Sequence, residues 1–501
     1  MRLGALIDDL DAAVGDIDVA GIATDSREVC PGEVFFALPG LRTDGRRHLA
    51  EAVVRGARAI VAEGPAVDAK VPVVLVRGVR RVLAAAAARF AGDPSAGLVL
   101  VGVTGTNGKT STTFILESIW RAAGLETGVI GTVGYRGAGR LDRPAPLTTP
   151  EAPALQALLA EMRHAGATHV AMEVSSHALA QERVLGCRFD AVVFTNLTRD
   201  HLDFHGDAES YYRAKARLFL EHLAASGKPE AVAVVNVDDP AGARLAGEVR
   251  TRCVRVGAGE TADVRPLDVE TTLTGTRGVL AFGGAPLPFC TRLVGAPQVE
   301  NLLGAAAAAW ALGIAPEAVA AGLAAVTAPP GRLERFDGPG FTVMVDYAHT
   351  PDALARALTV LRPLTPGRLI AVFGCGGDRD PGKRPLMGEA AARLSDVVVL
   401  TSDNPRTEDP GRILDAIEAG VVQAGLGPLG EHGRGYLVQA DRRAAIALAI
   451  RLARPGDLVL VAGKGHEDYQ IVGHEKHHLD DREEVRRALG SGDAERLEEG
   501  R

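Results

Sequence analysis

The sequence predicts an α/β protein of three domains: a smaller N-terminal α/β domain, a central domain on a P-loop-type, mostly parallel sheet, and a C-terminal Rossmann-like α/β domain. Three observations lead to this prediction. A chain of 501 residues is too long for one hydrophobic core. Continuous apolar runs alternate with helical patterns in two successive stretches. Segments containing Gly and Pro at residues 92–95 and 328–331 separate these stretches, so we expect domains at residues 1–92, 93–329 and 330–501.

The expected elements follow in chain order. The N-terminal region mixes short strands with a helix, at residues 34–37, 59–61, 73–76 and 82–90. The central region has apolar runs typical of strands buried on both faces, at residues 98–103, 169–172, 191–194 and 231–235, and a helix at 152–164. The last region has similar runs at residues 341–345, 369–373, 397–400 and 458–461. Nearly every polar motif directly follows one of these strands, where open parallel sheets bind ligands.

Composition excludes several classes of protein. The net charge of −8 disfavours non-specific nucleic-acid binding, so we expect no nucleic-acid partner. The five cysteines are scattered, without the paired spacing of a zinc site or a disulfide framework. The apolar run at the N-terminus is too short for a signal peptide, and no later run could span a bilayer. We therefore expect a cytoplasmic protein without membrane insertion.

Lysine is scarce in this chain. Of 55 basic residues only seven are lysine, so arginine supplies most of the surface charge. A lysine kept in such a composition is a candidate for chemistry that a guanidinium cannot perform. Four of the seven fall inside the motifs described next: Lys109, Lys215, Lys383 and Lys464.

The clearest motif is a phosphate-binding loop. The strand at 98–103 runs into Thr104-Gly-Thr-Asn-Gly-Lys-Thr-Ser111, and a helical pattern follows. Glycines let backbone N–H groups surround phosphates at a helix N-terminus. In this arrangement Lys109 can reach the β- and γ-phosphates, and the Thr110 hydroxyl can bind Mg²⁺. A glycine-rich turn without nucleotide is the alternative, although Gly-Lys-Thr between a strand and a helix favours the nucleotide.

Two later segments supply candidate metal ligands, Glu173 in one and Asp200, His201 and Asp203 in the other. Glu173 ends the strand at 169–172, and a carboxylate at a buried strand end needs a cation or several hydrogen bonds. A local cap is the alternative for Glu173. His201, between Asp200 and Asp203, follows the strand at 191–194 and could instead belong to a turn with Asx-type bonds. Lys215 lies in an amphipathic helical pattern and taken alone would be a solvated lysine.

Together these motifs resemble the Mur ligase family over essentially the whole chain. The resemblance rests on long motifs in the family's order: Thr104–Ser111, Glu173-Val-Ser-Ser-His177, Thr195-Asn-Leu197 with Asp200-His-Leu-Asp203, the Lys215 helix, Gly331-Arg-Leu-Glu334, Asp346–Asp352, Phe373–Asp380, Asp403-Asn-Pro-Arg406 and Gly463–Gln470. It implies an ATP-dependent amide ligase of peptidoglycan precursor synthesis. Two segments depart from the family pattern: Pro297-Gln298, before Asn301, and Leu41-Arg42-Thr43.

The resemblance also implies a catalytic and cofactor set. The ATP contacts would be Gly105, Thr106, Asn107, Gly108, Lys109, Thr110, Ser111, Asn301, Arg332 and Asp346. Mg²⁺ would be held by Thr110, Glu173, His201 and Lys215, with Lys215 converted by CO₂ to a carbamate. The catalytic residues would be Lys109, Lys215, His201 and Glu173.

Within the family, the chain is similar to members that add meso-2,6-diaminopimelate to UDP-N-acetylmuramoyl-L-alanyl-D-glutamate through an acyl phosphate. The resemblance implies that residues 1–92 bind the UDP-muramoyl group, 93–329 bind ATP and 330–501 bind the amino acid, in a monomer. The muramoyl dipeptide would contact Thr148, Thr149, Ser175, Gln181 and Arg183. Ser26 would belong to a segment, Thr24–Arg27, that docks the uridine nucleotide. Diaminopimelate would contact Arg379, Asp403, Asn404, Arg406, Gly463 and Glu467.

Three alternatives remain. A lysine-adding muramoyl ligase would lack a use for Arg406, whose fork suits the distal carboxylate of diaminopimelate. A folylpolyglutamate-type synthetase would not explain the separate N-terminal region that resembles a uridine-nucleotide domain. A nucleotide-dependent switch would not need the combined Lys215 and His201 motifs.

Overall fold

The computed structural model describes residues 1–40, 43–65, 69–430 and 433–499, so Leu41 and Arg42 of the departing segment lie outside it. The chain divides into two compact units. The first comprises Met1–Asp268, Gly278–Phe289 and Glu300–Ala325, and the second Val269–Arg277, Cys290–Val299 and Val326–Arg501. The predicted boundary near residue 92 falls inside the first unit, although residues 22–75 form a sheet of their own. The fold is α/β, as predicted.

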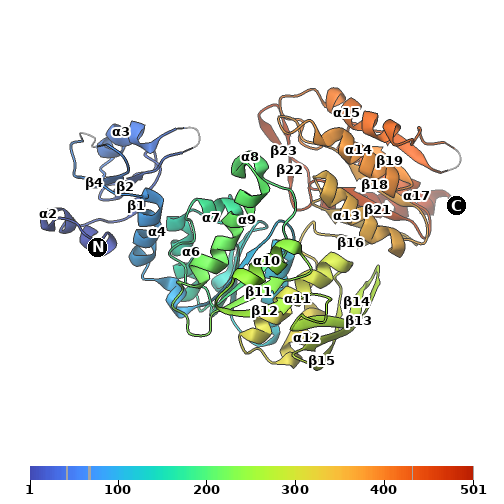
Figure 1. Cartoon of the computed structure of the whole chain (residues 1–501). Coiled ribbons are helices and arrows are strands. Elements are labelled where there is room, and N and C mark those ends of the chain that lie inside the picture. The colour runs from blue at the N-terminus through green and yellow to red at the C-terminus, as the bar shows by residue number, and fades with distance from the viewer. Residues whose placement is uncertain (41–42, 66–68, 431–432, 500–501) are drawn as a thin grey trace. The chain divides into compact units, whose positions relative to one another are not determined.

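The N-terminal sheet is small and parallel (Figure 1). Its strands run in the order β1 (Ile22–Ala23), β2 (Val34–Ala37), β3 (Ala59–Ala62) and β4 (Val73–Leu75). The helices of this region are α1 (Leu3–Leu6), α2 (Ala12–Gly15), η1 (Gly45–His48), α3 (Leu49–Val54) and α4 (Val79–Phe90). Helix α4 begins earlier than predicted because Gly78 adopts a left-handed conformation directly before it.

An eleven-stranded sheet dominates the first unit. Its order is β15-β14-β13-β12-β11-β10-β5-β9-β6-β7-β8. The pairs from β13 to β6 are parallel, whereas β6–β7 and β7–β8 are antiparallel. The strands are β5 (Val99–Thr104), β6 (Thr127–Ile130), β7 (Tyr135–Gly137), β8 (Leu141–Arg143), β9 (His169–Glu173), β10 (Ala191–Phe194), β11 (Val232–Asn236), β12 (Arg252–Val256), β13 (Val264–Thr272), β14 (Gly275–Phe282) and β15 (Ala285–Thr291).

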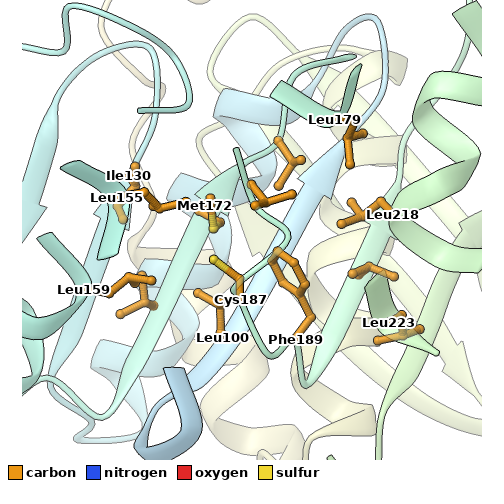
Figure 2. Close-up of a cluster of buried hydrophobic side chains, with 14 of the residues drawn as sticks. Leu100, Ile130, Leu155, Leu159, Met172, Leu179, Cys187, Phe189, Leu218 and Leu223 are labelled. Atoms are coloured by element: carbon orange, nitrogen blue, oxygen red, sulfur yellow. The ribbon is translucent and has the colours of Figure 1, made fainter. Parts of the chain in front are cut away.

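Helices and short turns connect these strands. They are η2 (Pro94–Gly97), α5 (Lys109–Ala122), η3 (Ala138–Arg140), α6 (Ala152–His164), α7 (Ser176–Ala180), α8 (Leu202–His205), α9 (Ala208–Arg217), η4 (Leu218–Leu223), α10 (Pro240–Glu248), α11 (Ala296–Ala311) and α12 (Pro316–Ala325). A large apolar cluster fills one side of the sheet, with Leu100, Met172 and Phe189 among its fully buried members (Figure 2). Burial of this size fixes the carboxyl ends of β5, β9 and β10, where the polar motifs begin.

The second unit is a six-stranded sheet with helices on both faces. Its order is β16-β17-β21-β18-β19-β20, and only the edge pair β16–β17 is antiparallel among the pairs described. The strands are β16 (Glu334–Asp337), β17 (Thr342–Asp346), β18 (Leu369–Phe373), β19 (Val397–Leu400), β20 (Gly435–Val438) and β21 (Leu458–Ala462), with a separate hairpin of β22 (Tyr469–Val472) and β23 (Glu475–His478). The helices are α13 (Pro351–Leu361), η5 (Arg362–Leu364), α14 (Lys383–Leu394), α15 (Pro410–Gln423), α16 (Arg442–Leu452) and α17 (Asp481–Glu499).

Alternate residues of these strands enter two different cores. Ala371 and Phe373 belong to the cluster with α13, α14 and α15, whereas Ile370 and Val372 belong to the cluster with α16. This two-sided burial explains why the strands read as unbroken apolar runs. In the described parts of the chain, no helix is both long enough and apolar enough to cross a membrane.

Candidate functional site

The predicted phosphate loop follows β5, which lies between β9 and β10. Gly105 and Gly108 have φ of 150° and 88°. A side chain at Gly105 would overlap the Thr195 hydroxyl, and one at Gly108 would overlap the side chain of Asn301. Glycine is therefore required at both positions. The contact at Gly108 also places Asn301 against the loop, although the two residues are far apart in sequence.

Two lysines meet at one carbonyl of this loop. Lys109 Nζ donates to the carbonyl oxygens of Gly105 at 2.9 Å and Thr106 at 3.0 Å, and Lys215 Nζ donates to Gly105 at 2.8 Å. Lys215 is only 1% exposed. Burial lowers the pKa of Lys215 well below its usual range, and the charge of Lys109 lowers it further, while Asp200 opposes the shift. Lys215 therefore loses its proton far more readily than a surface lysine.

The segment after β10 braces the same loop. Thr195 Oγ1 donates to the Asn107 carbonyl at 2.6 Å. The backbone N–H of Thr106 donates to the Asn196 carbonyl, and that of Asn107 to Asn196 Oδ1, each at 2.9 Å. The hydroxyl of Tyr211, on α9, lies 3.2 Å from Thr106 Oγ1. Contacts from β10 and α9 thus hold the loop in one shape.

Glu173, at the end of β9, is held by three hydrogen bonds. Thr110 Oγ1 donates to its Oε1 at 2.9 Å. The Thr132 N–H donates to Oε1 at 2.9 Å, and the Thr132 hydroxyl donates to Oε2 at 3.0 Å. Ser111 is buried beside Thr110 on the first turn of α5. Sequence reasoning did not identify Thr132, whose only signal is its place just after β6.

The residues predicted to bind the muramoyl peptide form a chain of contacts from Glu173. Thr149 Oγ1 donates to the Glu173 carbonyl at 2.8 Å and accepts from the Ser175 N–H at 3.1 Å. Arg183 donates to the Thr149 carbonyl at 2.9 Å and to Gln181 Oε1 at 2.8 Å. A further contact joins the hydroxyls of Thr148 and Thr132 at 3.0 Å. The structure therefore brings this set together, while Ser26 lies in the N-terminal region and donates to Glu51 at 2.6 Å.

His201 stands close to the two lysines in a left-handed backbone conformation, with φ of 52°. Its ring packs edge-on against His177 at 4.8 Å between centroids. Burial lowers the pKa of His201; Asp200 opposes this, and Lys109 and Lys215 lower it further. Burial likewise lowers the pKa of His177 to about 4, with His201 contributing. Both imidazoles are therefore neutral near pH 7 and have a nitrogen able to accept a proton or a metal.

The donor set suits a divalent cation only in part. Within the described ranges no three His, Cys, Asp or Glu side chains are grouped as a metal site. The predicted set is of another kind, because it includes the Thr110 hydroxyl and Lys215. The hydroxyl and the Glu173 carboxylate are oxygen donors of the type that Mg²⁺ prefers, and a carbamate on Lys215 would add another. With that modification the set fits Mg²⁺.

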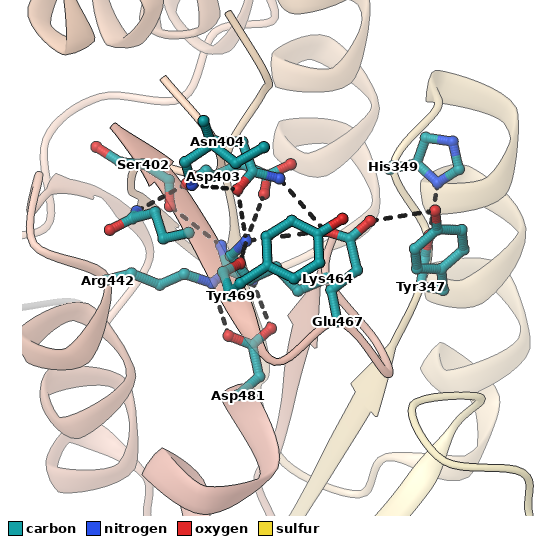
Figure 3. A network of polar contacts seen from close by, with 12 residues as sticks. Tyr347, His349, Ser402, Asp403, Asn404, Arg442, Lys464, Glu467, Tyr469 and Asp481 are labelled. Carbon is teal, nitrogen blue, oxygen red and sulfur yellow. Dashed lines mark hydrogen bonds and ion pairs between the residues drawn. The ribbon is translucent and has the colours of Figure 1, made fainter. Parts of the chain in front are cut away.

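In the second unit, a buried polar network surrounds Lys464 (Figure 3). Lys464 Nζ donates to Asn404 Oδ1 at 3.0 Å and to the Tyr469 carbonyl at 2.6 Å, and it pairs with Asp403 at 3.2 Å. Burial raises the pKa of Asp403, but Lys464 and Arg442 together lower it, and the net pKa is below its usual range. Burial and the charge of Asp403 raise the pKa of Glu467, which accepts from Asn404 Nδ2 at 3.3 Å. Gly463 adjoins this network, and its φ of 122° favours glycine.

The two predicted arginines lie on neighbouring loops. Arg406 Nη1 donates to the Gly377 carbonyl at 2.8 Å, and the Arg406 N–H donates to the Ile471 carbonyl at 3.0 Å. Arg379 is exposed and bonds to the carbonyl of Asp378 at 3.1 Å. Both side chains approach Gly376, so the structure brings them together at one edge of the Lys464 network.

Asp346 and Arg332, the other predicted ATP contacts, adjoin at the end of β17. Asp346 accepts from the N–H groups of Leu333 at 2.8 Å and Ala348 at 2.9 Å. Burial raises the pKa of Asp346, and Arg332 opposes this. The Arg332 guanidinium lies 4.7 Å from the centre of the Tyr347 ring. A flat cation on an aromatic ring is a surface on which a base or ribose could stack.

A phosphate loop on an α/β scaffold, with an acidic strand end and a buried lysine beside it, is typical of a nucleotide-binding enzyme. Three family descriptions match the chain: Mur ligase family, catalytic domain, at residues 18–91; Mur ligase middle domain at 103–309; and Mur ligase, glutamate ligase domain, at 331–465. The chain belongs to the Mur ligase family.

Individual relatives agree with this assignment. The UDP-N-acetylmuramoyl-L-alanyl-D-glutamate–2,6-diaminopimelate ligase of Geobacter metallireducens is 49% identical over 483 residues, 94% of each chain. That of Gloeobacter violaceus is 50% identical over 481 residues, 95% of this chain and 94% of the relative. A solved structure of a ligase with the same name matches with a TM-score of 0.72 and 34% identity, over 98% of this chain and 99% of that one. MurF ligase from Thermotoga maritima, in complex with ADP, matches with a TM-score of 0.62 and 21% identity over 96% and 99%, a likeness of fold alone.

Proposed function

We propose that this chain uses ATP to join meso-2,6-diaminopimelate to UDP-N-acetylmuramoyl-L-alanyl-D-glutamate in peptidoglycan precursor synthesis. Relatives 45% to 50% identical carry the name of that ligase. The structural observation that supports the choice of amino acid is the hydrogen bonding between Ile471 and the segment Asn404–Arg406. Arg406 N–H donates to the Ile471 carbonyl, and Ile471 N–H donates to Asn404 Oδ1, which places a guanidinium and Glu467 around one network. These are complementary to the carboxylate and ammonium of an amino-acid terminus.

The chemistry divides into two steps. A carboxylate is a poor electrophile, so the D-glutamyl carboxylate attacks the γ-phosphate of ATP and displaces ADP. The amine of diaminopimelate then attacks the acyl phosphate, an amide bond forms, and phosphate leaves. Lys109 holds the phosphates and offsets their charge, and the loop glycines direct N–H groups at them. Catalysis therefore depends on positioning and electrostatics rather than on a nucleophilic side chain.

Lys215 would act after modification. Its neutral amine attacks CO₂, a nitrogen–carbon bond forms and one proton leaves, which yields a carbamate. Thr110, Glu173, His201 and the carbamate would hold Mg²⁺, which when bound neutralises charge on the phosphoryl oxygens. The lowered pKa of Lys215 supports this role, because only the unprotonated amine reacts with CO₂.

Each part of the chain has its own role in this reaction. Residues 1–92, including Ser26, bind the UDP-muramoyl group; residues 93–329 bind ATP and the peptide; residues 330–501 bind the amino acid. Thr148, Thr149, Ser175, Gln181 and Arg183 face the peptide. We place the enzyme in the cytoplasm, as a monomer.

The test is phosphate release from ATP by the full chain. We expect turnover only when both the UDP-muramoyl dipeptide and an amino acid are present, with diaminopimelate strongly preferred to lysine. Equal use of lysine would refute the amino-acid assignment. Steady ATP hydrolysis without the dipeptide would refute the ligase reaction itself.

A further inference from the structure

Lys464 is fully buried in the pocket proposed to bind diaminopimelate, and neither step of the proposed reaction uses it. Its side chain is 0% exposed. It contacts four neighbours: Asn404, the Tyr469 carbonyl, Asp403, and Glu467 at 3.9 Å. A buried ammonium destabilises the folded state unless it is paired and hydrogen-bonded. Lys464 therefore depends on these four contacts.

The network fixes which way the Asn404 amide points. Its Oδ1 accepts from Lys464 Nζ at 3.0 Å and from the Ile471 N–H at 2.9 Å. Both partners are donors, so a flipped amide would set NH₂ against two donors. The Nδ2 group therefore points to Glu467 Oε2. Asn404 thus presents hydrogen-bond donors on the side of the pocket where Glu467 presents an acceptor.

Charges of alternating sign continue behind the lysine. Arg442 donates to both carboxylate oxygens of Asp481 at 2.7 Å and to the Ala462 carbonyl at 2.9 Å. Its charge acts on Asp403, which pairs with Lys464. Lys464 therefore stands between two carboxylates, Asp403 and Glu467, that would otherwise repel one another.

We infer that Lys464 is a positioning residue for diaminopimelate: it locks the Asn404 amide in one orientation and keeps Glu467 ionised toward the ammonium of the bound amino acid. The inference rests on the proposed function, since it supposes that this pocket binds diaminopimelate. Lys464 itself need not touch the substrate. It acts through two residues that do.

The first test compares Lys464→Met, Asn404→Ala and the double variant by phosphate release. We expect Lys464→Met to raise the KM for diaminopimelate at least about tenfold, the loss expected for a charged hydrogen bond. The KM values for ATP and dipeptide should stay within about twofold. The double variant should lose less than the product of the two single losses, because part of the lysine's effect passes through the Asn404 amide. The control is Lys476→Met, at an exposed lysine whose Nζ lies 4.2 Å from the Tyr469 ring centre, and it should leave every KM unchanged.

Lys464→Gln provides a second test, because it keeps a hydrogen-bond donor for Asn404 that Lys464→Met removes. Glutamine can still donate to Asn404 but carries no charge. It should therefore reverse much of the rise in the KM for diaminopimelate that Lys464→Met causes. The charged and titratable groups around Glu467 are Asp403, Lys464, Arg442, Tyr347 and Tyr469. Burial and Asp403 already raise the pKa of Glu467, and loss of the Lys464 charge raises it further. Affinity for diaminopimelate is present above that pKa and is lost as pH falls through it, so the loss should move about one pH unit higher.

Two outcomes would overturn the inference. One is an unchanged KM for diaminopimelate in both Lys464 variants. The other is a double variant whose loss equals the product of the single losses. If wild-type enzyme does not use diaminopimelate, the proposed function fails instead, so the two failures are distinguishable.

Discussion

The sharpest prediction concerns Lys215→Arg. Both Lys215 and Lys109 bind the Gly105 carbonyl oxygen, at 2.8 Å and 2.9 Å, so their nitrogens lie within about 6 Å of one another. At an effective dielectric constant near 20, two like charges at that distance repel by about 3 kcal/mol. A carbamate at the same place would attract Lys109 by a similar amount. Arginine carries a positive charge and cannot form the carbamate.

The expected consequence is a loss of turnover without loss of the fold. The difference between attraction and repulsion is about 6 kcal/mol, and less than half of it expressed in the transition state lowers kcat about 100-fold. We expect Lys215→Arg to lose at least that much, with dipeptide affinity nearly unchanged. Phosphate release should be measured in buffer stripped of CO₂ and again with added bicarbonate.

Bicarbonate distinguishes the explanations. It should restore wild-type enzyme that has been depleted of CO₂ and have no effect on Lys215→Arg. Intact-protein mass spectrometry of rapidly quenched wild type should show the mass of one added CO₂ and the variant should not. Near-normal turnover by the arginine variant would refute the carbamate and the charge argument together.

Three further predictions address other parts of the molecule. Arg406→Ala should lower the ratio of kcat/KM for diaminopimelate over lysine at least about tenfold, because lysine lacks the carboxylate that the guanidinium pairs; an unchanged ratio in competition assays would contradict this pocket. Thr132→Val removes the hydroxyl that donates to Glu173 at 3.0 Å and should lower kcat about tenfold without changing the KM for diaminopimelate, while Thr132→Ser should behave as wild type. Arg442→Met leaves Asp481 buried and unpaired and should lower the free energy of unfolding by about 3–5 kcal/mol. Urea unfolding should show a lower midpoint, and adding Asp481→Leu should largely restore it. A decrease of less than about 1 kcal/mol would contradict the burial argument.

The sequence predicted most of the buried strands and little of the exposed sheet. Residues 369–373 and 397–400 were predicted with the observed bounds, because burial on both faces leaves a continuous apolar run. Strands β13 and β15 were not predicted, since each exposes many of its residues and shows no strict alternation. Strand β20 was also missed, since it begins with glycine, a residue depleted in strands, and its last two residues are not fully buried.

The candidate site divides in the same way. Glu173 could be found because it ends a recognisable strand and stands in a long motif. Its partner Thr132 is 41 residues away and carries no motif, and the contact arises only because β6 and β9 are neighbours in the sheet. The Arg442–Asp481 pair joins two helix starts 39 residues apart, and no local pattern marks either residue. Propensity and spacing report short-range order, whereas these contacts depend on which strands and helices become neighbours.

The pairing of Arg442 with Asp481 makes the start of α17 sensitive to substitution and truncation. Asp481 opens α17, and its partner Arg442 donates to the carbonyl of Ala462, the residue before Gly463. Val485, one turn further along the helix, is fully buried in the core cluster that includes Ile446 and Val461, so changes there should also destabilise the second unit. A truncation that removes the first turn of α17 would leave the buried guanidinium of Arg442 without its carboxylate partner. The first turns of α17 are therefore part of the core of the second unit, and their removal should destabilise it.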